Sequence, residues 1–205
     1  METLQQKLRK YFIMGSQDCN RDPEKILTEA IEAGITAFQY REKGANALTG
    51  KQQIELGKRL RDICYEHDIV FIVNDDVNLV EPLQADGIHV GQSDTPVEKV
   101  RERFPNKWIG LSVSNIEEVN RSPIDLVDYV GAGPIFETPT KPDKKPVGVE
   151  WIKTLRKQFP HLPIVGIGGM NTTNAASVID AGADGVSFIS AVTKAKNIQQ
   201  AVAGL

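Results

Sequence analysis

The stretches IVGIGGM (164–170) and GVSFIS (185–190) decide the fold that this sequence predicts. Each is a short apolar run that ends at glycine or serine, which is typical of a buried strand followed by a tight loop. Barrels of eight parallel strands often bind a phosphate group through the loops after their seventh and eighth strands. An open doubly wound sheet instead carries its glycine-rich loop after the first strand. Glycines placed this late therefore favour a barrel.

Six more apolar runs precede these two, and longer amphipathic segments separate them. All eight runs are brief and rich in Val, Ile and aromatic residues, as strands are. They are YFIM (11–14), AFQY (37–40), IVFIV (69–73), GIHV (87–90), WIGLS (108–112), DYVGA (128–132), PIVGI (163–167) and GVSFI (185–189). Strands that alternate with helices form parallel sheets, and eight such units can close into a ring. We therefore expect a (β/α)8 TIM barrel, a single catalytic domain over residues 1–205, with a phosphate-binding site at strands 7 and 8.

Helix boundary signals fall between these runs. Asp22-Pro23 places proline at the first position of a helix that should close at Gly34. A longer helix is expected over about 49–67, and Asn115 can cap the helix that begins at Ile116.

Composition narrows the class of protein. The formal net charge of −3 gives no electrostatic reason to expect a nucleic acid or an anionic membrane as partner. Cys19 and Cys64 form neither a metal-ligand spacing nor a disulfide framework. The N-terminal segment shows no cleavage-type signal, and no apolar run approaches the length of a membrane span. We expect a cytoplasmic protein with small-molecule partners, and these features leave a homo-oligomer open.

The first polar motif, QYREK (39–43), ends the second strand. Because strand side chains alternate between faces, Gln39, Arg41 and Lys43 should share one face. Arginine can hold two phosphate oxygens at once and lysine adds a point charge, so this face could bind an anion. A solvated strand end with a Glu42–Lys43 pair explains the motif equally well.

The second motif is a set of carboxylates after the third and fourth strands. Asp75 and Asp94 follow neighbouring strands and could converge on one hard cation. Mg²⁺ prefers oxygen ligands and often takes few protein carboxylates, with substrate phosphates completing its shell. Helix capping is the competing explanation, since Asp76 and Asp94 each precede a helix-like run.

The third motif is the long loop GPIFETPTKPDKKPVG (133–148) after the sixth strand. Its hydroxyl and amine side chains suit phosphate binding and a mobile cover, although a charged surface loop would look the same. In the fourth motif, Gly169 and Ser190 could offer backbone N–H groups to a phosphate, or the glycines could simply allow tight packing. The hydroxyl and amine side chains of the 133–148 loop are Thr138, Thr140, Lys141, Lys144 and Lys145.

The three histidines do not suggest nucleophilic catalysis. His67 and His161 are expected at the surface, whereas His89, inside GIHV, should fill the barrel interior or orient its neighbours. We find no histidine that pairs with a serine or cysteine nucleophile in the sequence pattern.

In order along the chain, these residues resemble the thiamine phosphate synthase family. The resemblance runs from about Tyr11 to Val192 and rests on five motifs in register: QYREK, VND, DGIHVGQSD, GPIFETPTK and GIGGMN…GADGVSFIS. One motif alone would be a weak signal, but five in the same order are specific.

The resemblance implies roles for individual residues. It assigns charge neutralisation and catalysis to Arg41, Lys43, Lys141 and Ser112, and binding of one Mg²⁺ to Asp75 and Asp94. The family usually has leucine at Tyr40, whose side chain should face the helices. The implied pyrimidine diphosphate contacts are Gln39, Tyr40, Arg41, Glu42, Lys43, Asn74, Ser112 and Lys141, and the implied thiazole phosphate contacts are Thr138, Pro139, Thr140, Gly169, Ile189 and Ser190.

The family chemistry joins a pyrimidine methylene carbon to a thiazole nitrogen and expels pyrophosphate. Cations and a metal without an evident nucleophile–base pair suit such a dissociative displacement. Three alternatives remain at this stage: a thiazole tautomerase on the same barrel, another phosphate-binding barrel such as an isomerase or aldolase, and a non-catalytic binder of thiamine phosphate. The tautomerase would not need the diphosphate-binding residues, which this sequence retains.

Overall fold

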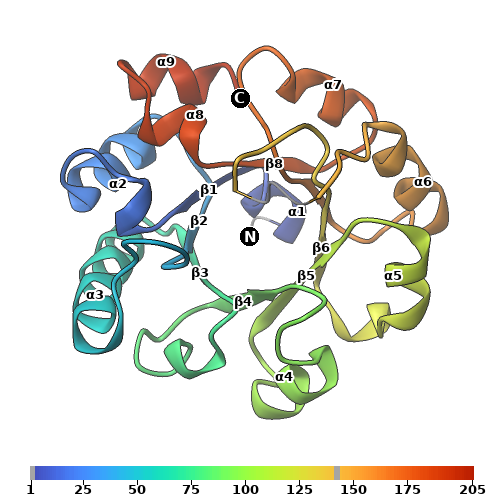
Figure 1. Ribbon diagram of the computed structural model, residues 1–205, viewed down its shortest axis with the longest axis horizontal. Helices are drawn as coiled ribbons and strands as arrows, with labels where there is room; N and C mark the ends of the chain where they lie inside the picture. The colour runs from blue at the N-terminus through green and yellow to red at the C-terminus, as the bar shows by residue number, and fades with distance from the viewer. Residues whose placement is uncertain (1–2, 141–143) are drawn as a thin grey trace.

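The structure, a computed structural model, describes residues 3–140 and 144–205, and its centre is a closed barrel of parallel strands (Figure 1). The strands pair in chain order, and β8 pairs with β1 to complete the ring. Their bounds are β1 (Lys10–Met14), β2 (Ala37–Tyr40), β3 (Val70–Asn74), β4 (Gly87–Val90), β5 (Trp108–Val113), β6 (Tyr129–Ala132), β7 (Ile164–Gly166) and β8 (Gly185–Phe188). Each apolar run predicted as a strand overlaps one of them, so the predicted (β/α)8 fold is confirmed.

Helices form a ring outside the barrel (Figure 1). They are α2 (Pro23–Glu32), α3 (Gly50–Glu66), α4 (Val97–Arg103), α5 (Ile116–Arg121), α6 (Glu150–Gln158), α7 (Ala175–Asp180), α8 (Ser190–Thr193) and α9 (Ile198–Ala203), with 3-10 helices η1 (Ser16–Asp18), η2 (Val77–Leu79) and η3 (Ile124–Leu126). The predicted caps are confirmed: Asp22 accepts from the backbone N–H of Glu24 at 3.0 Å, and Asn115 accepts from that of Glu118 at 2.8 Å. Within the described residues, none of these helices is both long and apolar enough to span a bilayer.

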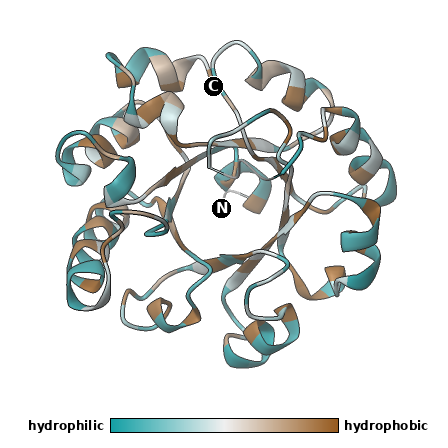
Figure 2. Cartoon of the chain, viewed as in Figure 1, coloured by the Kyte–Doolittle hydropathy of each residue, from teal (hydrophilic) through white to brown (hydrophobic). Residues whose placement is uncertain are grey.

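Alternation along the strands divides the apolar residues between two layers. Side chains such as Phe38 and Phe71 point outward and pack with Leu60 of α3 in the layer between strands and helices. Side chains of the opposite parity, such as Ile72 and Val165, fill the barrel interior. Figure 2 shows hydrophobic residues along the strands, with hydrophilic residues on the outer helix faces. Each fully buried large apolar side chain contributes about 1.5–3 kcal/mol to folding.

A short helix that the sequence analysis did not anticipate, α1 (Leu4–Lys7), lies before β1. Thr3 caps it in a capping box with Gln6. Leu4 and the fully buried Leu8 pack with Tyr11 and other interior residues, and Figure 1 shows α1 at the centre of the ring. The amino end of the barrel interior is therefore filled by α1 and Leu8.

The same hydrogen-bonded unit recurs at the amino ends of three strand pairs. In the last of them, Asp184, just before β8, accepts from the backbone N–H of Ile164 in β7 at 2.8 Å. Its carboxylate also pairs with Arg156 of α6 at 2.6 Å. The equivalent pairs are Arg61–Asp86 at β3–β4 and Arg101–Asp128 at β5–β6. We call these units the Arg–Asp staples.

The β1–β2 pair carries a neutral version of the staple. Thr36, just before β2, accepts from the backbone N–H of Lys10 through its hydroxyl at 2.9 Å. The four strand pairs are therefore built on one plan, and the first uses a hydroxyl where the others use a carboxylate with an arginine. In such barrels the amino ends of the strands serve stability, which leaves the carboxyl ends for chemistry.

Candidate active site

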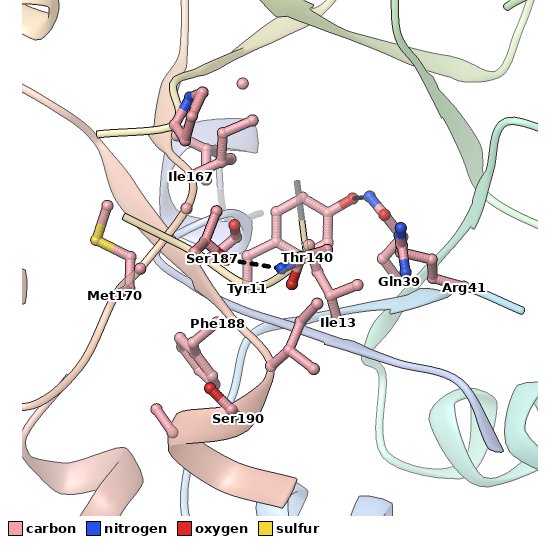
Figure 3. Close-up of a pocket in the computed structure, with 18 of the residues that line it drawn as sticks. Tyr11, Ile13, Gln39, Arg41, Thr140, Ile167, Met170, Ser187, Phe188 and Ser190 are labelled. Atoms are coloured by element: carbon pink, nitrogen blue, oxygen red, sulfur yellow. Dashed lines mark hydrogen bonds between the residues drawn. The ribbon is translucent and has the colours of Figure 1, made fainter. Parts of the chain in front are cut away.

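A cavity of about 430 Å³ opens at the carboxyl ends of the strands. Residues from all eight strands and from the loops after β6, β7 and β8 surround it, and Figure 3 shows some of them. Its lining mixes apolar residues such as Ile13 and Met170 with polar ones such as Arg41 and Ser190. A concave, mostly apolar pocket with a few convergent polar groups is the usual form of a small-molecule site.

The inner wall of the cavity is a chain of buried polar side chains. The amide of Gln39 donates to the Tyr11 hydroxyl at 2.8 Å (Figure 3), and the hydroxyls of Tyr11 and Tyr129 are 2.8 Å apart. His89 continues the chain, with Nδ1 3.1 Å from the Tyr129 hydroxyl and Nε2 2.9 Å from Oγ of Ser112. All five residues line the cavity. We call this set the polar chain.

The expected interior position of His89 is confirmed, and its ring also contacts Ser112. His89 and Ser112 lie 23 positions apart in sequence, but β4 and β5 are adjacent, and both side chains point into the barrel. The contact depends on strand pairing, which sequence spacing does not show. His67 and His161 are at the surface, as predicted.

The arginine of the QYREK motif reaches the cavity. The backbone N–H of Arg41 donates to Met14 of β1 at 3.0 Å, which extends the β1–β2 ladder past Tyr40. Within the described part of the chain its guanidinium makes no hydrogen bond or ion pair. Asn74, at the end of β3, lines the same cavity. A free guanidinium at the mouth of a barrel is suited to bind an anion.

Lys43, Asp75 and Asp94 form a charged cluster beside the cavity rather than on its lining. The amine of Lys43 pairs with the carboxylate of Asp75. Asp75 has a φ of 58°, a left-handed conformation that aspartate tolerates better than most residues, and its N–H donates to the backbone oxygen of His89 at 2.9 Å. This turn places the Asp75 carboxylate beside the amine of Lys43.

Asp94 is held against its own loop and beside a like charge. Its carboxylate accepts from the backbone N–H of Gly91 at 2.7 Å. Burial raises the pKa of Asp94 above its usual value; the Gly91 hydrogen bond opposes the shift, and the neighbouring negative charge of Asp75 adds to it. Two carboxylates in contact favour a cation between them.

The charged cluster fits Mg²⁺ better than a metal that needs a full protein shell. Among the described residues no three His, Cys, Asp or Glu side chains converge on one point. Two adjacent carboxylates supply oxygen ligands only, and Mg²⁺ commonly uses one or two carboxylates with substrate phosphates. Asp75 and Asp94 are the residues that could hold it.

The loops after β6, β7 and β8 meet on the other side of the cavity. Thr138, Pro139 and Thr140 line it from one loop, and Gly169, Ile189 and Ser190 line it from the other two. These six residues are the thiazole phosphate contacts that the family resemblance implies.

Gly168 and Gly169 also serve packing. Both have positive φ values, 89° and 70°, and a Cβ atom at Gly169 would lie 2.5 Å from the backbone oxygen of Glu137. Non-glycine side chains would be strained at both positions. The glycines therefore bring the loop after β7 against the loop after β6, and their backbone also faces the cavity.

Some residues named from the sequence lie elsewhere. Tyr40 points outward, as its parity predicted, and donates to the backbone oxygen of Gln53 at 2.9 Å. Glu42 accepts from the N–H and hydroxyl of Ser16 and thereby fixes the loop after β1. Lys144 approaches Glu118 at 3.7 Å on the β5 side. Lys141 lies outside the described residues.

Several cavity residues escaped the sequence analysis. Asn171 and Lys194 line the cavity, yet neither belongs to a strand. Tyr11 and Tyr129 could have been found from parity, because each is two residues from another cavity-lining residue of its own strand. Tyr11 is two residues from Ile13 in β1, and Tyr129 is two residues from Gly131 in β6.

A closed eight-stranded barrel whose free cation, carboxylate pair and cavity gather at the carboxyl ends of the strands defines a barrel enzyme. A family model described as thiamine monophosphate synthase matches residues 10–192. A thiamine-phosphate synthase of Oceanobacillus iheyensis is 65% identical over 196 residues, which is 95% of each chain. The chain belongs to the thiamine monophosphate synthase family and is an enzyme of the transferase class.

Solved structures agree with this assignment. Thiamine phosphate pyrophosphorylase from Pyrococcus furiosus matches with a TM-score of 0.88 at 35% identity, covering 99% of this chain and 96% of that one. N-(5′-phosphoribosyl)anthranilate isomerase from P. furiosus matches with a TM-score of 0.64 at 15% identity, covering 96% of each chain. The second likeness reflects the fold alone.

Proposed function

We propose that this enzyme condenses 4-amino-2-methyl-5-(diphosphooxymethyl)pyrimidine with thiazole phosphate, carboxylated or not, to give thiamine phosphate and pyrophosphate. The observation that carries the proposal is that residues from five separate sequence motifs meet at one barrel mouth. They supply a free guanidinium, a carboxylate pair and a glycine-lined pocket, which together suit two anionic substrates. The 65% identity to a thiamine-phosphate synthase supports it.

The pyrimidine substrate occupies the inner end of the cavity in this proposal. Gln39 and Ser112 are buried there and would contact the ring, while Arg41 and Asn74 would hold the diphosphate near the charged cluster. Lys43 belongs to that cluster, and Lys141 retains its expected role as a further cation. Tyr40 and Glu42 would act only through the backbone and loop that they support.

The thiazole substrate occupies the outer end. Thr138, Pro139 and Thr140 would contact the ring, and the backbone N–H groups of Gly169, Ile189 and Ser190 would hold its phosphate. Hydrogen-bond donors that are fixed before the substrate arrives need no rearrangement when charge develops.

Asp75 and Asp94 would hold one Mg²⁺, which when bound neutralises charge on the pyrophosphate leaving group. Arg41 and Lys43 add positive charge beside the same group. The bond from the pyrimidine methylene carbon to the diphosphate oxygen breaks, and its electron pair leaves with pyrophosphate. The thiazole nitrogen then supplies the electron pair of the new carbon–nitrogen bond. The cavity walls keep water from capturing the pyrimidinyl cation.

The His89–Ser112 pair does not turn this site into one for nucleophilic catalysis. A serine nucleophile needs a histidine whose free ring nitrogen accepts the serine proton, while the other nitrogen donates to a carboxylate. Here the second nitrogen of His89 meets the Tyr129 hydroxyl, a neutral group. The pair is better suited to binding a substrate than to attacking one.

Incubation with both substrates and Mg²⁺ tests the proposal. We expect thiamine phosphate and pyrophosphate in equal amounts, and Arg41→Ala should lower kcat/KM by about 100-fold or more, since it removes a preorganised cation. Arg41→Lys should recover part of the activity because it restores the charge but not the planar fork. If the wild-type enzyme only isomerises the thiazole substrate, or only binds thiamine phosphate, the proposal is wrong.

We further propose a cytoplasmic location. Cys19 and Cys64 are both free thiols, and cysteines stay reduced in that compartment. The partners would be small molecules.

A further inference from the structure

The polar chain is nearly inaccessible, so the position of every proton in it matters. Its five members are between 0% and 7% exposed. A buried polar hydrogen without an acceptor costs more than the hydrogen bond would contribute. The protons must therefore be distributed so that each one has an acceptor.

Counting these protons fixes the donor and the acceptor of every hydrogen bond in the polar chain. The amide nitrogen of Gln39 donates to Tyr11, so the single proton of the Tyr11 hydroxyl goes to Tyr129. The Tyr129 proton then goes to Nδ1 of His89. Neutral His89 consequently carries its proton on Nε2 and donates it to Ser112.

The two ends of the chain therefore face the cavity with opposite character. The carbonyl oxygen of Gln39 is turned away from Tyr11 and is an acceptor. The hydroxyl proton of Ser112 is not used within the chain and is a donor. Turning the Gln39 amide would reverse every bond, so one end cannot change character without the other.

We propose that Tyr11, Tyr129 and His89 are positioning residues that order these protons and so select an aminopyrimidine over an oxopyrimidine. An aminopyrimidine offers an amino donor next to a ring-nitrogen acceptor, which matches Gln39 and Ser112. The corresponding oxopyrimidine offers an acceptor next to an N–H donor, and it would leave buried groups unpaired. This inference rests on the proposed function, because it deepens how the pyrimidine is recognised.

The barrel wall is shaped around the polar chain. A Cβ atom at Gly110 of β5 would lie 2.2 Å from Cζ of Tyr129 and 2.5 Å from Nδ1 of His89. One at Gly131 of β6 would lie 2.9 Å from Cε1 of His89. Burial raises the pKa of both Tyr11 and Tyr129, so the hydroxyls keep their protons at neutral pH. The rings have fixed places, and neither tyrosine hydroxyl loses its proton near pH 7.

Binding of two non-cleavable analogues tests the proposal. Each carries a methylene-bridged diphosphate, one on the aminopyrimidine and one on the matching oxopyrimidine. We expect wild-type enzyme to bind the amino form at least about tenfold more tightly, because buried groups that lose their partners reject the wrong analogue. Tyr129→Phe should bring the ratio of the two Kd values close to one, since it interrupts the chain and keeps the ring.

The matched control removes a comparable hydrogen bond outside the cavity. The indole N–H of Trp151 in α6 donates to Val113 at 3.1 Å from the outer side of β5. Trp151→Phe should lower Tm as Tyr129→Phe does, yet leave the Kd ratio at its wild-type value. If Tyr129→Phe also leaves the ratio unchanged, the chain is only structural and the proposal is wrong.

A spectroscopic measurement does not depend on substrate at all. An ¹⁵N–¹H correlation spectrum of the histidine side chains should place the His89 proton on Nε2, and a proton on Nδ1 would overturn the inferred direction. Failure of the wild-type enzyme to make thiamine phosphate would reject the proposed function. Normal turnover with the wrong tautomer or an unchanged Kd ratio would reject only this inference.

Discussion

Asp94 shows how a single residue can oppose folding and still serve a site. Its pKa is raised by burial and by the charge of Asp75, so its ionised form is held at a free-energy cost in the absence of a cation. Asp94→Asn should relieve the repulsion and leave Tm unchanged or slightly higher. Because Asp94 is proposed to hold Mg²⁺, the same change should reduce Mg²⁺-dependent turnover by about 10–100-fold.

Initial rates across a range of Mg²⁺ concentrations, together with thermal melts, check this prediction. Asp76→Asn is the control, since Asp76 is adjacent to the charged cluster but caps η2 by accepting from the N–H of Asn78 at 3.0 Å. It should change stability slightly and leave the Mg²⁺ dependence intact. Wild-type turnover in Asp94→Asn would remove Asp94 from the metal site.

Gly110 is a position in β5 where a side chain would not fit. The Gly110→Ala methyl group would collide with Tyr129 and His89 at 2.2 and 2.5 Å. Overpacking of this kind costs about 1–3 kcal/mol, and here it would also displace the polar chain. Chemical denaturation should show the loss. Gly34→Ala, where φ is 97° and no atom lies within 4 Å, should cost only backbone strain and leave activity unaltered.

At the scale of elements, the three Arg–Asp staples join α3, α4 and α6 to the strand pairs that follow them. Arg156 binds Asp184, at 2.6 Å, and several backbone oxygens that include Gly182 at 2.9 Å, with its side chain only 25% exposed. Arg156→Gln should lower the free energy of unfolding by about 1–3 kcal/mol, because buried acceptors lose their donor.

A surface pair provides the comparison for that prediction. Arg59 contacts Glu24 at 2.5 Å, but its side chain is 52% exposed. Exposed ion pairs contribute at most about 1 kcal/mol. Arg59→Gln should therefore change the urea midpoint little, whereas Arg156→Gln should shift it clearly. Equal shifts would show that the staples act no differently from surface pairs.

The elements differ in how far sequence could predict them. The eight strands were predictable because each is a short apolar run. The starts of α2 and α5 were predictable because Asp22 and Asn115 are residue types that commonly cap helices. Helix α1 was missed because four residues show no periodicity. Leu4 of α1 and the adjacent Leu8 become core residues only when the barrel closes around them. The Arg–Asp staples join residues 25 to 28 positions apart, so only the fold reveals them.

The candidate site divides in the same way. Strand alternation was enough to place Gln39 and Arg41 on one face and Tyr40 on the other. It could not place Asp75 against Lys43, because that contact needs a left-handed turn at Asp75. It also could not find the His89–Ser112 contact, which needs β4 beside β5.

The whole molecule is a ring whose amino end is filled by α1 and Leu8 and whose cavity opens at the carboxyl end. Gln39 and Ser112 are buried at the inner end of that cavity, and Ser190 is exposed at its rim. A thiazole bound at the rim would lie across the path of the pyrimidine. The reactants should consequently bind in a set sequence, with the pyrimidine diphosphate first. In initial-rate experiments an unreactive pyrimidine analogue should compete with the pyrimidine, while an unreactive thiazole phosphate analogue should inhibit uncompetitively against it. Noncompetitive inhibition by the thiazole analogue would mean that the two enter independently.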